Sequence, residues 1–445
     1  MIPFMKAPIF ILCLAVATHC WAEDSAIQNN AFLSTEKAPL SIYISTQNLA
    51  VQNAVNAGLV EFLFQQPEIA YQHFQAAEQG DSGCILAQLG ILLCSPSHTP
   101  LYREHLARLN QLINDTEITP VEEWYVSTFL QYLNGDLAGA AHAFRNRSAT
   151  YKRDYMAAAW DIILNHYAGE STETLIQRAD SFLQARPDNL VANYCRAIVE
   201  EHQSKPSDNA LKCAQKALSM HSGNLTLGVL TGYLLARAGK HSEALQYFHA
   251  ASQHPIAQLQ IPYLHLKAGD TKSRQTAFLA ARKVAEKAAA LQPQTDYEQL
   301  LYWEGHTLLL RMLVLQQTTP SRAAIQTAHS ICKAPEGSLL SLAQECMVAA
   351  IQARSLADMG RPSISQTTLE KAQRLLERLN REGTQYSDLK GIQRTCYLRA
   401  VQACEAAILR ARLSLYSEST SIWQPHLEQL LNQQQSHFLP PVLPR

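Results

Sequence analysis

The sequence lacks the short motifs by which most enzymes are recognised. Neither HExxH, GxSxG, a P-loop, GxGxxG nor CxxC occurs where its chemistry could operate. His241, His249 and His254 also lack the i, i+4 spacing of a metal-binding pair on a helix. We therefore expect no enzyme, no cofactor and no metal. A catalytic site assembled between lobes of the fold is the least favoured alternative.

Charged residues are scarce as well. Only 17% of the 445 residues are charged, and the formal net charge is −1. Such a chain is not expected to bind nucleic acid or an anionic membrane through a basic face. Residues 1–270 carry 17 Lys and Arg against 24 Asp and Glu, a balance of −7, and residues 271–445 carry 20 against 14, a balance of +6. Two solvated faces of opposite sign are the favoured interpretation, and head-to-tail self-association is the alternative.

Long apolar runs are absent beyond the first 22 residues, and a transmembrane helix needs about 20 such residues. The single run, APIFILCLAVA, follows Lys6 and precedes small residues that end at Ala22. This pattern is typical of a secretory signal peptide. A lipoprotein signal is disfavoured because His19 precedes Cys20. We predict cleavage after Ala22 and an exported chain, either periplasmic or secreted.

Eight of the ten cysteines lie beyond this segment: Cys84, Cys94, Cys195, Cys213, Cys332, Cys346, Cys396 and Cys404. Their even number permits disulfides in an exported chain. The first two and the last two are each expected within one helix, too far apart for a Cα separation below about 7 Å. Cys195 with Cys213, and Cys332 with Cys346, are expected on neighbouring helices, where a disulfide remains open. We expect mostly buried free thiols.

A period of 34 or 35 residues runs through the first half of the chain. In its clearest copy, residues 226–255, a turn at Gly239 precedes the pattern A-x3-F-x2-A, which starts at Ala244. Pro255 is expected to end the second helix of this copy. Related helix faces start at Ala210, Leu175, Ala140 and Ala70, and Gly135 lies at the turn before Ala140. Each copy therefore predicts two short helices joined by a turn.

This pattern resembles the tetratricopeptide repeat, a helix–turn–helix unit. The resemblance covers residues 50–258 and implies an all-α superhelix, in which the first helix of each hairpin lines a concave groove. Residues 70–90, AYQHFQAAEQGDSGCILAQLG, also resemble functionally obscure bacterial repeat proteins, so the likeness implies little about activity. In this register His73 points away from the packed face, and Cys84 is a structural thiol.

The second half is expected to form longer, less regular helical hairpins that continue the solenoid. We predict helices near 272–291, 296–317, 321–333, 338–359, 364–382, 386–417 and 422–435, with breaks at proline and glycine. The whole chain then divides into a signal peptide (1–22), an irregular lead-in (23–45), repeats (46–258), a helical-hairpin region (259–435) and a proline-rich tail (436–445).

The concave groove is the predicted binding surface. The residues expected to line it are aromatic: Phe62, Tyr125, Phe129, Tyr132, Trp160, Tyr167 and Tyr233. Such a surface suits an apolar helix or an extended peptide. It lacks the Lys and Asn with which related repeats hold a peptide carboxylate. Alternatively, these side chains pack on the next hairpin, or the chain's own tail fills the groove.

We therefore expect a non-enzymatic, exported scaffold that binds a protein or peptide partner and no nucleic acid. The alternative is a self-associating, homo-oligomeric component of the cell envelope.

Overall fold

The structure, a computed structural model, describes residues 42, 44–95, 99–115, 117–201, 203, 205–267, 270–293, 296–316, 318–385, 391–416 and 420–435. These residues form 20 α-helices and no strand. In chain order the helices are α3 (Leu49–Leu63), α4 (Pro67–Gly80), α5 (Ile85–Cys94), α6 (Pro100–Asp115), α7 (Pro120–Leu133), α8 (Leu137–Thr150), α9 (Tyr155–Tyr167), α10 (Thr172–Ala185), α11 (Leu190–Ile198), α12 (Asp208–Met220), α13 (Leu225–Arg237), α14 (His241–Ala250), α15 (Pro255–Lys267), α16 (Thr271–Ala289), α17 (Asp296–Leu315), α18 (Arg322–Cys332), α19 (Leu339–Asp358), α20 (Pro362–Gln385), α21 (Gly391–Leu415) and α22 (Thr420–Gln435). The predicted all-α fold is confirmed.

The first hairpin shows why the repeat pattern contains glycine, alanine and phenylalanine. Ala70, Phe74 and Ala77 lie on one face of α4 and are fully buried. A Cβ atom at Gly58 of α3 would lie 2.6 Å from the Phe74 ring, and one at Gly90 of α5 would lie 2.2 Å from it. The ring occupies the space that the two glycines leave, so α3 and α5 both approach α4 closely.

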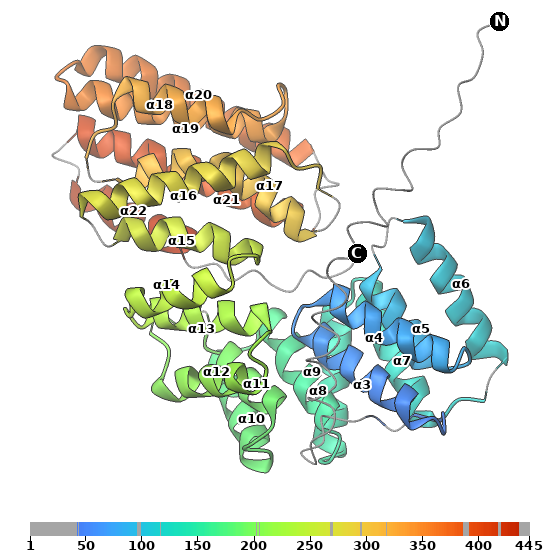
Figure 1. Cartoon of the computed structure of the whole chain (residues 1–445). Coiled ribbons are helices and arrows are strands. Elements are labelled where there is room, and N and C mark those ends of the chain that lie inside the picture. Colours follow the sequence, from blue (N-terminus) through green and yellow to red (C-terminus); the bar gives the residue numbers. More distant parts are fainter. Residues whose placement is uncertain are drawn as a thin grey trace, which may run out of the picture.

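Hairpins of this kind stack in sequence order, as in a tetratricopeptide-like solenoid (Figure 1). Two predicted turns are confirmed: Gly135 has a φ of 85° and Gly239 a φ of 80°, a conformation that favours glycine. The stack is interrupted once. In the described residues α6 packs on α5 but has little contact with α7, and Figure 1 shows α6 at the edge of the molecule.

The second half consists mainly of longer helices that lie side by side in Figure 1. All seven helices predicted there are present, with ends that differ by a few residues. One further helix, α15, was not predicted, because Pro255 was interpreted as a helix end. It is instead the first residue of α15, where a proline costs no hydrogen bond. The predicted boundary at 258 falls inside this helix, whereas the turn between α14 and α15 lies before it.

Several predictions fall outside the described residues. These are the signal peptide (1–22), most of the lead-in (23–45) and the proline-rich tail (436–445). The division into domains also stays a prediction. Among the described helices, none is both long enough and apolar enough to cross a membrane.

Candidate partner-binding surface

The predicted aromatic groove is not an open surface. Tyr125, Phe129, Tyr132, Trp160 and Tyr233 are at most 3% exposed. They belong to the core between hairpins, as the packing alternative supposed, so the prediction that they contact a partner is corrected. The reason is physical: large aromatic rings on short helices gain more from burial against the next hairpin than from remaining in a hydrated groove.

Ring contacts show how these side chains pack. Phe144 of α8 lies at the centre, with its ring centroid 5.4 Å from that of Phe129 and 6.0 Å from that of Trp160. The Tyr125 hydroxyl donates to Asp154 Oδ1 at 2.7 Å, which satisfies its polar end inside the protein. These residues join α7, α8 and α9 into one aromatic core.

The two remaining groove residues, Phe62 and Tyr167, are half-buried because the chain contacts itself across the groove. The Phe62 ring lies 5.9 Å from the Trp160 ring, and Gln65 Nε2 donates to the Tyr167 hydroxyl at 3.1 Å. The end of α3 thus reaches α9, about a hundred residues further along the chain. The first hairpin therefore packs on this part of the groove. The alternative that the tail fills the groove concerns residues 436–445, which lie outside the described residues.

The same end of α3 reaches α11 and the end of α12. Phe64 is fully buried, and its ring lies 4.9 Å from the Tyr194 ring in an edge-to-face arrangement. His221 Nε2 is 2.9 Å from Glu61 Oε1. We call Glu61, Phe62, Phe64 and Gln65, together with Trp160, Tyr167, Tyr194 and His221, the closure cluster. It holds the superhelix in a tight curl.

His73 is not one of the buried residues of α4, and it lies close to Glu61 and His221 of this cluster. It is half-buried, and burial lowers its pKa. The Glu61 carboxylate partly opposes this effect, and His221 adds to it. The sequence offered no signal for this cluster, because His221 follows Glu61 by 160 residues.

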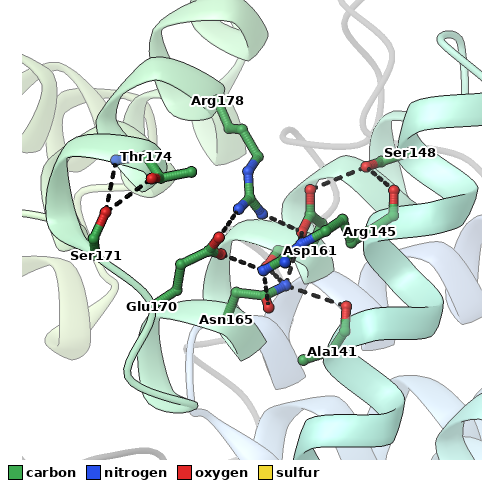
Figure 2. A network of polar contacts seen from close by, with 9 residues as sticks. All are labelled: Ala141, Arg145, Ser148, Asp161, Asn165, Glu170, Ser171, Thr174 and Arg178. Carbon is green, nitrogen blue, oxygen red and sulfur yellow. Dashed lines mark hydrogen bonds and ion pairs between the residues drawn. The ribbon is translucent and has the colours of Figure 1, made fainter.

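A second polar cluster lies where α8, α9 and α10 meet (Figure 2). Arg178 Nη1 is 2.7 Å from Asp161 Oδ1, and both Arg178 and Arg145 pair with Glu170. Asn165 Nδ2 donates to Asp161 Oδ1 at 2.8 Å. Burial raises the pKa of Asp161, while Arg178 and its other partners lower it by less. Two positive and two negative charges balance one another, so the cluster ties hairpins together rather than presenting an uncompensated charge.

An open surface site does occur elsewhere, as a groove of 660 Å³ along α7 and α8. All the residues that line it come from this one hairpin, Pro120–Tyr151. Trp124 is half-buried and Tyr151 is 58% exposed, so both rings are accessible from the solvent. We call this the α7–α8 groove.

Arg147 organises the α7–α8 groove. Its guanidinium carbon lies 4.5 Å from the centroid of the Trp124 ring and 5.1 Å from that of the Tyr151 ring. Arg147 Nε also donates to Asp154 Oδ2 at 2.5 Å, which balances its charge. Cation–π contacts and an ion pair thus hold the three side chains in place. His142 and Asn146 add polar groups to the same groove.

Sequence reasoning missed this groove because it considered only the first helix of each hairpin. The available signal was the pairing of Trp124, at the head of one helix, with Arg147 and Tyr151 at the end of the next. This signal could not identify the groove from the sequence, because the ends of the two helices meet only in the folded hairpin.

The cysteines are all free thiols in the described chain, and seven of the eight are buried. Cys195 Sγ lies 4.0 Å from a carbonyl oxygen of α9, and Cys213 Sγ lies 3.8 Å from the Asn209 side chain. Cys332 Sγ lies 4.0 Å from a carbonyl oxygen of α17. Neither of the two pairs that the sequence left open, Cys195 with Cys213 or Cys332 with Cys346, is formed. The expectation of buried free thiols agrees with the structure.

Cys84 is one of these thiols. It lies at the start of α5, and burial raises its pKa to about 11. The neutral thiol therefore dominates at physiological pH, as expected for a structural cysteine. Among the described residues, no group of three or more His, Cys, Asp and Glu side chains could hold a metal ion.

Comparisons with known proteins give little further information. No family model matches the chain, and no curated protein matches it. Among solved structures, the chain is similar to one described as "Crystal structure of APC/C hetero-tetramer Cut9-Hcn1". The identity is 11% and the TM-score is 0.37, over 95% of this chain and 83% of that one.

Proposed function

We propose that the chain is a non-enzymatic helical-repeat scaffold that is exported and binds a segment of another protein in its α7–α8 groove. The fold supports the general proposal that the chain binds other proteins, since stacked helical hairpins expose a large surface and commonly serve protein–protein interaction. The observation that supports the α7–α8 groove as the binding site is that Trp124, Arg147 and Tyr151 lie together there and are accessible. Tryptophan, tyrosine and arginine dominate the binding energy of protein interfaces.

The geometry of the groove favours a peptide segment. Its rings are held in place by Arg147, so little side-chain entropy is lost when they contact a ligand. His142 and Asn146 can hydrogen-bond the backbone of an extended chain, which a purely apolar groove could not do. A volume of 660 Å³ is enough for a few side chains of such a segment.

The charges of the groove point to a ligand segment of low net charge. Arg147 is paired with Asp154, and Asp136 accepts a hydrogen bond from Gly139 N at 2.9 Å, which caps α8. Both charges are therefore engaged within the protein. An apolar or polar but uncharged segment would bury little unpaired charge on binding.

Site-specific photo-cross-linking tests this proposal. A photoreactive phenylalanine analogue at position 151 should cross-link one partner, which is then purified and titrated calorimetrically. The Trp124→Ala/Tyr151→Ala variant should bind it about 10- to 100-fold more weakly, the range expected for interface hot spots.

The matched control is Tyr416→Ala/Trp423→Ala, which removes two aromatic rings from a smaller hollow of 360 Å³ bordered by α20, α21 and α22. Its affinity should equal that of the unsubstituted chain. Unchanged affinity in the Trp124→Ala/Tyr151→Ala variant would refute the assignment of the groove.

The charge difference between the two halves supports a second candidate, a self-associating structural component. Residues 1–270 and 271–445 carry balances of −7 and +6, so opposite ends of two copies would attract one another, and salt would weaken that attraction. Light scattering across a salt series distinguishes the candidates. A monomer at every ionic strength would eliminate self-association.

A further inference from the structure

Two cysteines that are distant in sequence meet in the core of the second half. Cys346 of α19 and Cys404 of α21 are fully buried, and Cys346 Sγ donates to the carbonyl oxygen of Ala372 at 3.3 Å. Cys404 Sγ also lies 3.4 Å from the carbonyl oxygen of Ala343, one helical turn before Cys346. The Cys404 thiol therefore lies against the turn of α19 that carries Cys346, at the interface between α19 and α21.

Both helices carry buried small side chains close to the two cysteines in sequence. Ala343 and Ala350 of α19 are fully buried, as are Ala403 and Ala407 of α21 to within 2%. Because the distance between packed helices depends on the side chains between them, an alanine-rich interface brings the two backbones close together. A disulfide needs such closeness, with a Cα separation of about 4.4–6.8 Å.

The other thiols of this half have different neighbours. Cys332 Sγ faces a carbonyl oxygen of α17, as described above. Cys396 lies on α21, two turns before Cys404, and interacts electrostatically with Arg311 of α17. Cys346 is the one cysteine of α19. It is therefore the thiol that Cys404 can pair with on that helix.

We propose that Cys346 and Cys404 form a disulfide that joins α19 to α21 when the chain folds in an oxidising compartment. The two thiols lose two protons and two electrons, and one S–S bond forms between them. A disulfide such as oxidised glutathione accepts the electrons, and its own S–S bond breaks to give two thiols. This cross-link site is independent of the α7–α8 groove.

The surroundings of the pair determine when the bond forms. The neighbouring Cys346 side chain and burial both raise the pKa of the Cys404 thiol. Thiol–disulfide exchange requires a thiolate and access to the oxidant, and both are disfavoured once the helices have closed. The bond is therefore made during folding, and the folded, reduced chain is oxidised slowly.

Peptide mapping tests the proposal directly, because trypsin places the two cysteines in different peptides. Cys346 lies in residues 334–354 and Cys404 in residues 400–410. The chain is purified from an oxidising compartment, or refolded with oxidised and reduced glutathione, and is then denatured with an alkylating reagent. We expect one cross-linked species of these two peptides, which separates on reduction. Recovery of both peptides as alkylated thiols in both preparations would overturn the proposal, as would cross-links to other cysteines.

Thermal unfolding gives a second measurement. Reduction should lower the Tm of the oxidised chain by about 5 °C, since the bond constrains the unfolded state of a long loop. The Cys346→Ala/Cys404→Ala variant should show no such dependence on reductant, whereas the Cys332→Ala/Cys396→Ala variant should retain it. A reductant-dependent Tm in the first variant would contradict the assignment. Peptide mapping needs no substitution, so it decides the question even if a variant fails to fold.

Discussion

Both halves of the molecule are built from α-helices, but the helices differ in length and in how they pack. Helices α3–α14 are 9–16 residues long and alternate in short hairpins, whereas α15–α22 reach 25 residues. In the first half the end of α3 returns to contact α9, α11 and the end of α12. In the second half, long helices such as α19, α20 and α21 pack along much of their length.

This difference shows that repeat geometry decides whether a concave surface is available. Short hairpins that pack through glycine and phenylalanine rotate relative to one another, and the rotation accumulates until the first hairpin meets the fourth and fifth. The long helices of the second half are instead stabilised by packing along neighbouring helices, with alanine at the contacts. The prediction of an open groove assumed a wider curl than these residues form.

The largest expected loss of stability concerns the buried charges of the second half. Glu304 of α17 pairs with Arg311 and lies 3.2 Å from Arg399 Nη2 of α21. Burial favours a higher pKa for Glu304, but the two arginines outweigh it and the pKa is lowered. Glu304→Gln removes the charge that both guanidinium groups contact, at a cost of about 3–5 kcal/mol.

Hydrogen exchange measured by region sharpens the comparison. Protection should fall in α17 and α21 and remain in α8 and α9. The control is Glu286→Gln, which removes an exposed ion pair with Arg282 and should cost under about 0.5 kcal/mol. An equal loss of protection in both halves would show that the two halves unfold as one unit.

The next effect concerns the curl of the first half. Phe64→Ala removes the ring that packs on Tyr194 and should cost roughly 3 kcal/mol. It should also loosen the closure cluster, so the radius of gyration from X-ray scattering should increase. Phe74→Ala, at an equally buried position inside the first hairpin, should destabilise similarly without expanding the molecule. Equal radii for the two variants would mean that the closure cluster does not hold the curl.

The smallest expected effect is a pH dependence of the stability, caused by a histidine at the junction between the halves. His254 is buried before α15, Ile256 N donates to its Nδ1 at 3.2 Å, and burial lowers its pKa to about 4. The unfolded state therefore binds more protons between pH 4 and about 6.5, so this contribution to stability is complete above pH 6.5 and is lost as the pH falls. Between pH 7 and pH 5 the loss should be about 2 kcal/mol.

Denaturant titrations at several pH values measure this dependence. His254→Asn keeps an acceptor at the start of α15 without a titrating ring, so its stability should fall less over the same range. His142→Asn, at an exposed position, is the control and should behave as the unsubstituted chain. If His254→Asn and the unsubstituted chain lose the same stability, His254 does not carry the effect.

Several features were predictable from the residues because they depend on near neighbours in the chain. The face formed by Ala70, Phe74 and Ala77 and the turns at Gly135 and Gly239 follow from helical spacing and from the conformation of glycine. The breaks at proline and glycine placed the long helices of the second half. Pro255 was misinterpreted because the same residue that stops one helix also suits the first position of the next.

Contacts between residues that are distant in the chain were determined by the tertiary structure alone. The spacing of Phe62, Tyr125 and Trp160 indicated one face of successive helices, but their burial depends on the angle at which hairpins stack. The meeting of Glu61 with His221, and of Cys346 with Cys404, depends on the same angles. Local pattern therefore decided which segments are helical and which residues pack within a hairpin. The sum of many small rotations between hairpins decided which surfaces close and which, like the α7–α8 groove, stay open.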